Sequence, residues 1–158
     1  MQPLAGNGAH WLDLEPATHP DDVADLLAPT YWSALRRSLH GAVRVDGPDL
    51  GPLRLRLASR RGPVLLAFGV AEQSSTPDGV LELAFPIHGG LTAGASGGTL
   101  TLSVAVDRAG VRVDGYTPRL AGGPAVLRPL AALYGSGQRR LHDRVTGAYL
   151  ASLRQVLR

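Results

Sequence analysis

The residue of this chain whose position best suits chemistry is Arg119. It continues the alternation of the strand-like stretch 111–117, which points its side chain toward the apolar face. An arginine at the end of an inward-facing row can bind a carboxylate, a phosphate or an enolate oxygen. The alternative is that Pro118 ends the strand and Arg119 lies in solvent. Both interpretations stay open at the level of sequence, and Arg119 is a candidate catalytic residue.

A second group of polar side chains lies on the stripe of the C-terminal helical pattern. The residues at helical spacing on one side of the stretch 127–158 are Tyr134, Gln138, Leu141, Val145, Tyr149, Ser152 and Val156. Gln138 and the tyrosine hydroxyls can hydrogen-bond a polar ligand group, and Tyr134 can act as an acid. Tyrosine rings also pack in ordinary cores with their hydroxyls at the rim, so a structural role is the alternative.

The chain contains five histidines, of which His88 and His142 are candidate general bases. His88 follows a strand-like run beside a glycine-rich loop, and His142 neighbours the helical stripe. No His-x-x-x-His spacing or acid cluster accompanies them, and cysteine is absent, so no metal site is expected. The loop 89–98 lacks the Gly-Lys-Ser/Thr ending of a phosphate-binding loop. We therefore expect no cofactor.

Composition indicates one domain and narrows the partners. A chain of 158 residues with 44% hydrophobic residues can bury a sizeable core. The net charge is +3 and every basic Lys/Arg position is arginine, but the arginines are dispersed and aromatic residues are few. Because single-strand binding needs a basic groove with interleaved aromatics, no nucleic acid is expected. Neither a signal peptide nor a membrane-spanning run is recognisable, so the expected location is cytoplasmic.

The order of elements follows from hydrophobic periodicity. A short strand is predicted over 10–15 and a helix from Pro20, which Pro29 ends or kinks; a second helix covers 30–40 and stops at Gly41. Period-two alternation then predicts six antiparallel strands. These occupy 42–46, 53–57, 63–73, 81–87, 100–106 and the stretch from 111. The long C-terminal helix is expected to lie in the hollow of this sheet.

That order resembles the helix-grip fold of the SRPBCC superfamily, which includes START-like lipid-transfer domains and polyketide aromatase/cyclases. The resemblance covers roughly residues 10–157 and rests on element order alone. It implies an α+β domain over 1–158, with 1–9 frayed, in which a seven-stranded curved antiparallel sheet carries two short helices and a long C-terminal helix. A lipocalin-like or nitrobindin-like barrel and a ketosteroid-isomerase-like cone are the competing architectures.

What the resemblance implies about function is a small hydrophobic molecule in an internal cavity between sheet and helix. The candidate ligand contacts are the following: Trp32, Phe68, Phe85, Gln138, Leu141 and Tyr149. Trp32 is either a gate at the cavity mouth or an anchor between helix and sheet. We expect a cofactor-independent cyclase or dehydratase of polyketide or natural-product biosynthesis; the alternatives are a non-catalytic carrier or sensor of hydrophobic metabolites and an interaction module with a filled core.

Overall fold

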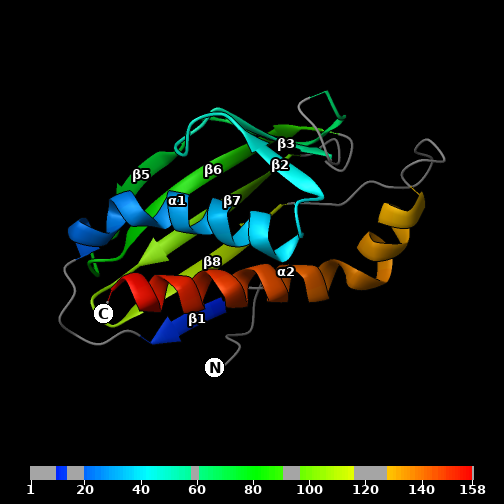
Figure 1. Ribbon diagram of the computed structural model, residues 1–158. Coiled ribbons are helices and arrows are strands. Elements are labelled where there is room, and N and C mark those ends of the chain that lie inside the picture. Colours follow the sequence, from blue (N-terminus) through cyan, green and yellow to red (C-terminus); the bar gives the residue numbers. More distant parts are fainter. Residues whose placement is uncertain (1–9, 14–19, 58–60, 91–96, 116–127, 158) are drawn as a thin grey trace.

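The computed structural model describes residues 10–13, 20–57, 61–90, 97–115 and 128–157. They form one antiparallel sheet of eight strands and two helices, an α+β architecture (Figure 1). The strands are β1 (His10–Asp13), β2 (Val43–Asp46), β3 (Leu53–Leu57), β4 (Val64–Phe68), β5 (Glu72–Ser75), β6 (Leu81–Gly89), β7 (Gly98–Val104) and β8 (Arg108–Asp114). The helices are α1 (Pro20–Ser38) and α2 (Arg128–Val156).

Helix α1 replaces the two short helices that the sequence predicted. It starts at Pro20, as expected, and runs through Pro29 to Ser38. A proline inside a helix removes one backbone hydrogen bond and crowds the preceding turn. Residues on both sides of Pro29 are nevertheless buried against the sheet, among them Leu27 and Tyr31, and this packing holds the helix together across the proline. The helix stops near the predicted Gly41, but the left-handed backbone already begins at His40 (φ 49°) and continues at Gly41 (φ 77°), whose N–H donates to the carbonyl of Arg36.

The sheet has the strand order β1-β8-β7-β6-β4-β3-β2, with β5 paired to β6 outside this path. The continuous strand predicted over 63–73 is thus two strands. The chain breaks after Phe68, where Gly69 donates its N–H to the carbonyl of Pro86 and Ala71 donates to that of Leu50. Strand β4 then pairs with the end of β6 and β5 with its beginning. All of β5 is exposed, so it extends the sheet without adding to the core.

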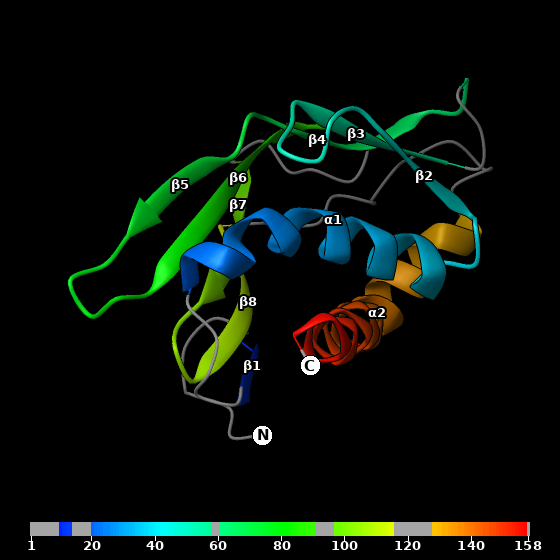
Figure 2. The ribbon, with the colours of Figure 1, turned by 60° about the vertical axis from the view of Figure 1, so that its left-hand side comes forward.

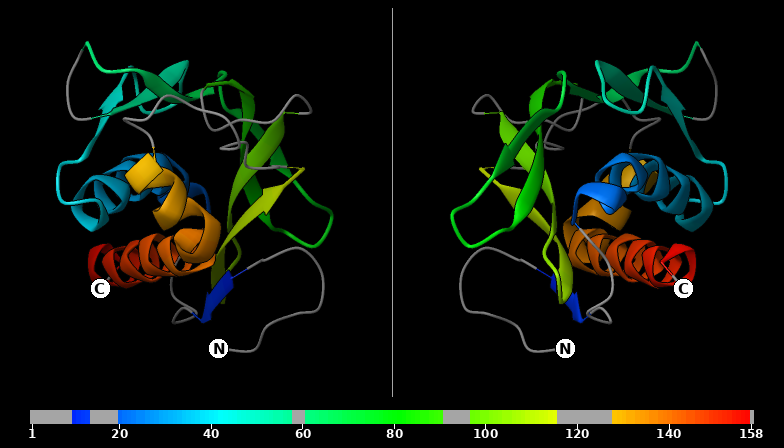
Figure 3. Two further views of the ribbon diagram at one scale, coloured as in Figure 1. Left: turned by 90° about the vertical axis from the view of Figure 1, so that its right-hand side faces the viewer. Right: turned by 90° about the vertical axis from the view of Figure 1, so that its left-hand side faces the viewer.

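The sheet curls around α1, and this arrangement corrects our expectation for the C-terminal helix (Figures 2 and 3). Helix α1 contacts β2, β6 and β7 along the hollow, whereas α2 contacts α1, β8 and, through His142 and Asp143, His10 of β1. Val23, Leu27, Trp32 and other apolar residues of α1 are almost fully buried, so an apolar face of this helix meets the sheet. No helix in the described ranges combines the length and apolarity needed to cross a membrane.

The N-terminal strand β1 is the edge strand beside β8, and an aromatic side chain packs it there. Trp11 of β1 pairs with Gly110 of β8, and Arg108 places its guanidinium carbon 4.9 Å from the Trp11 ring centroid. A β-carbon at Gly110 would lie 2.7 Å from the Trp11 ring, so only glycine leaves room for the indole to lie on the strand. The absence of a side chain at Gly110 therefore sets how closely β1 docks.

This packing predicts opposite effects for two glycine substitutions. Gly110→Ala displaces Trp11 and should lower the free energy of unfolding by about 1–3 kcal/mol, the usual range for overpacking. Gly147→Ala should raise it by about 0.5–1 kcal/mol, because Gly147 lies exposed within α2 and a β-carbon there meets nothing within 4 Å. Urea denaturation followed by tryptophan fluorescence measures both. Equal effects of the two variants would show that Trp11 does not rest on Gly110.

Candidate functional site

Four of the predicted ligand contacts meet in one aromatic cluster. The ring of Trp32 has its centroid 5.3 Å from that of Phe68 and 5.3 Å from that of Phe85, while Tyr149 lies 5.4 Å from Tyr31. The Trp32 indole N–H donates to the backbone carbonyl of Asp49 at 2.9 Å. These contacts are those of an anchor between α1 and the sheet. A direct contact of Trp32, Phe68 or Phe85 with a ligand stays a prediction.

Helix α2 presents its buried residues to α1 and β8 along a stripe that the sequence predicted only in part. Val145 and Tyr149 are buried as expected, and Leu150 and Leu153 are buried as well. Val156, which the helical spacing placed on the stripe, is 53% exposed. The stripe therefore turns toward Leu153 near the end of the helix, where Leu157 also packs against the core.

Two hydroxyl groups are buried on this stripe without a polar partner. Thr146 is 1% exposed and Tyr149 is 0% exposed, and neither side-chain oxygen makes a hydrogen bond within the described part of the chain. They are three positions apart, so they lie on the same side of α2. Buried hydroxyls are nearly always hydrogen-bonded, which makes this pair unusual. The sequence analysis identified Tyr149 but not Thr146. The signal for Thr146 was its position beside Val145 and three residues before Tyr149, which places it on the same side of the helix.

Burial also fixes the chemical state of the tyrosine. Desolvation by burial, with a smaller contribution from the neighbouring Tyr31, raises the pKa of Tyr149 far above its usual value of 10.0. The hydroxyl therefore stays protonated at physiological pH. In this state it can donate one hydrogen bond and accept another, but it cannot serve as a base.

The candidate base His142 lies at the contact between α2 and β1. Its ring centroid is 5.3 Å from that of His10, and the Nε2 atom of His10 lies 3.2 Å from the Oδ1 atom of Asp143. His142 is half-buried and lies two helical turns before Tyr149, about 10 Å along the axis of α2. It is thus on the same side of the helix as the two unpartnered hydroxyls, but not in contact with the aromatic cluster.

The other candidates are not brought to this region. His88 follows the buried Ile87 and is exposed on the opposite face of the sheet, where its imidazole lies over Gly69. Arg119 lies outside the described residues. Tyr134, Gln138 and Leu141 belong to α2, but their side chains lie outside the described part as well. Among the described residues, no group of three or more His, Asp or Glu side chains is placed to hold a metal ion.

Comparison with known proteins does not assign this chain to a family. No protein-family model, no curated protein and no solved structure matches the chain. The candidate site is therefore defined by its own residues, of which Thr146 and Tyr149 are the most distinctive.

Removing the unpartnered hydroxyls should cost no stability. Tyr149→Phe and Thr146→Val should leave the free energy of unfolding unchanged or raise it by about 1 kcal/mol, because each deletes a desolvated group without breaking a hydrogen bond. Ser152→Ala is the matched control. Its hydroxyl donates to the Ala148 carbonyl at 2.7 Å and accepts from Arg37 at 2.8 Å, so its loss should lower the value by about 1 kcal/mol. Chemical denaturation of the three variants distinguishes these cases.

The raised pKa of Tyr149 also predicts a loss of stability in alkali. Above pH 10 a tyrosine releases its proton in the unfolded chain but not in the fold, so the unfolded state binds fewer protons and the free energy of unfolding falls as pH rises. The slope from this residue is about 1.4 kcal/mol per pH unit. Denaturation between pH 9 and 11 should show a shallower decline for Tyr149→Phe than for the wild type. Parallel curves would contradict the burial of this hydroxyl.

Proposed function

We propose that this protein binds a small, mostly hydrophobic molecule between α2 and the layer formed by α1 and β8. We also propose that the fold is of the helix-grip class. What supports the class is the strand order, in which β1 lies beside β8 and the curled sheet encloses a helix (Figure 2). In such a fold, a ligand is held where the helices meet the concave face of the sheet.

The observation that carries the binding proposal is the pair of buried hydroxyls on α2. Each unpartnered hydroxyl costs about 1–3 kcal/mol of stability, and the chain places two of them on one side of one helix. A carbonyl or hydroxyl group of a ligand would satisfy both, since Tyr149 and Thr146 can each donate and accept. Their buried neighbours Val145, Leu150 and Leu153 are apolar. The ligand class is therefore an apolar molecule with a single neutral polar end.

Access to this position requires a movement of α2. Both hydroxyl oxygens are enclosed by protein, so a ligand reaches them only when α2 separates from α1. We propose α2 as the element that moves, because it touches α1, β8 and His10 of β1, whereas α1 lies against β2, β6 and β7. The aromatic cluster around Trp32 would then remain as the floor of the opened site. The proposed internal cavity is the space that opens between α2 and α1.

The same site has an enzymatic form, a cofactor-independent cyclase or dehydratase for polyketide-like substrates. Enclosure would hold a flexible substrate in a productive conformation. The permanently protonated Tyr149 would polarise its carbonyl by hydrogen bonding, with His142 two turns away as the group that moves a proton. The alternative is a carrier that binds and releases the molecule unchanged. It requires only Thr146, Tyr149 and their apolar neighbours.

Native mass spectrometry of the purified protein tests the proposal, with the released molecule identified under denaturing conditions. We expect a retained apolar compound, or saturable binding of the fluorescent probe anilinonaphthalene sulfonate if the compound is lost. Since a hydrogen bond contributes about 1 kcal/mol, Tyr149→Phe and Thr146→Val should each weaken binding about fivefold while keeping their stability. Ser152→Ala should bind as the wild type does.

The outcomes separate the proposal from its rivals. Failure to retain a compound together with failure to bind the probe would contradict ligand binding and favour a filled interaction module. A substrate that is converted by the wild type but bound unchanged by His142→Gln would identify the enzymatic form. Return of an unmodified compound by both proteins would identify the carrier.

A further inference from the structure

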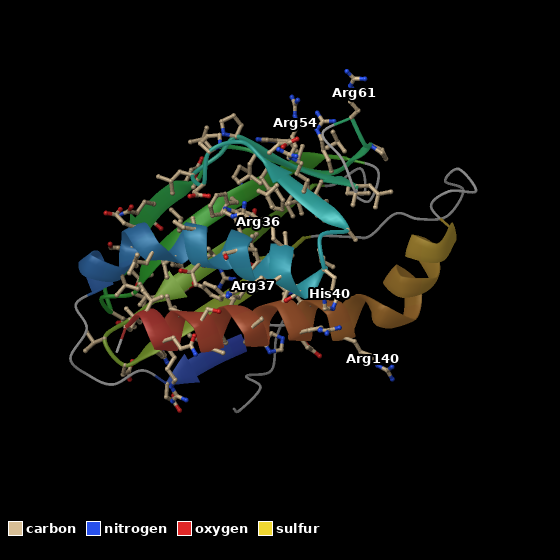
Figure 4. All side chains as sticks on the ribbon, in the orientation of Figure 1. Arg36, Arg37, His40, Arg54, Arg61 and Arg140 are labelled. Atoms are coloured by element: carbon tan, nitrogen blue, oxygen red, sulfur yellow. The ribbon has the colours of Figure 1, made fainter. Side chains whose placement is uncertain are left out.

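A cleft opens on the other face of the sheet, away from both helices. Its volume is about 430 Å³, and it lies where β2, β3, β4 and the end of β6 run side by side. Its lining includes Asp46, Arg54, Arg56, Ala67 and His88. Arg54 alternates with the buried Leu53 and Leu55 and so projects outward from β3, as Figure 4 shows.

The backbone explains why this face is hollowed. Ala67 pairs with Arg54 on one side and with Gly89 on the other, so two very small residues follow the arginine across the sheet. The register of β4 shifts against β3 at Leu55/Arg56 and against β6 at Ala67/Phe68. Such bulges bend strands and re-aim side chains. Ala67 and Gly89, which lie between the two bulges, have little or no side chain. The space above them is bordered by long side chains but is not filled by them.

Charges at the cleft are unbalanced in favour of cations. Asp46 binds Arg44 through Oδ1 at 2.8 Å and Arg56 through Oδ2 at 3.2 Å, so one carboxylate serves two guanidinium groups. Arg56 is further held by the Gly62 carbonyl at 3.1 Å. The side chains of Arg54 and His88 make no ion pair or hydrogen bond with any described residue. The cleft thus contains one arginine held in place and two donors with unused capacity.

We propose that this cleft binds a small organic anion through its phosphate or carboxylate group. Strands β3 and β6 flank β4, so the backbones of Arg54 and His88 are about 10 Å apart, a span that their side chains and one anionic group can bridge. Guanidinium groups match the oxygen geometry of carboxylates and phosphates. The organic part lies against Ala67 and Pro52. The cleft volume suits a ligand of metabolite size. This site is separate from the buried hydroxyls of α2 and stands without them.

Titration of the ¹⁵N-labelled protein with phenyl phosphate, followed by NMR, tests the proposal. We expect saturable shifts of the Ala67 and His88 amide signals, and none with the neutral analogue benzyl alcohol. Arg54→Gln should weaken phenyl phosphate binding about tenfold, since a hydrogen bond to a charged group contributes that much. Ala67→Leu should abolish it by filling the floor of the cleft. Inorganic phosphate should bind at the same residues but more weakly.

Arg61→Gln is the matched control, because Arg61 is another exposed arginine that does not line the cleft (Figure 4). It should bind phenyl phosphate as the wild type does. Equal weakening by Arg54→Gln and Arg61→Gln would overturn the proposal in favour of general charge attraction. Lack of saturation, or shifts that avoid Ala67 and His88, would overturn it as well. Arg54 is exposed, so Arg54→Gln keeps its fold and remains decisive if Ala67→Leu does not fold.

Discussion

The packing of Trp32 into the concave face of the sheet is the contact on which the other tertiary contacts depend. Its ring touches Phe68 of β4 and Phe85 of β6, and its N–H reaches the carbonyl of Asp49 beyond β2. One side chain of α1 thereby joins three parts of the sheet. Because aromatic pairs of this kind combine a large buried area with a preferred geometry, they fix both the depth and the direction of the helix. Tyr31 then offers its ring to Tyr149, and this contact docks α2.

The position of α1 decides what α2 can do. Helix α1 contacts three strands, whereas α2 lies on α1 and on the β8 and β1 side of the sheet. The α2 surface that faces inward combines apolar residues with the hydroxyls of Thr146 and Tyr149, a mixture that weakens a purely structural contact. Two unsatisfied hydroxyls at the contact between α2 and its neighbours lower the cost of separating them, which is the physical basis of the proposed opening.

The same strands supply core residues on one face of the sheet and cleft residues on the other. Leu53 and Leu55 of β3 point to the core, and Arg54 between them points outward to the cleft. In β6, Ile87 is buried beneath the helix and the next residue, His88, borders the same cleft. A polar site of this kind costs the core nothing, because successive side chains of a strand lie on opposite faces.

Local periodicity was sufficient to predict most strands, the start of α1 at Pro20, its stop at Gly41 and the α+β class. It was not sufficient to predict that Pro29 stays inside one helix, that β5 leaves the path of the sheet, or that Thr146 is buried, because each of these depends on contacts between distant segments. Which of the two helices lies along the hollow of the sheet also depends on contacts between distant segments. Both have an apolar face, and only the fit of Trp32 among Phe68 and Phe85 assigns that place to α1. Sequence therefore determined which faces are apolar, and tertiary packing decided which of them meet.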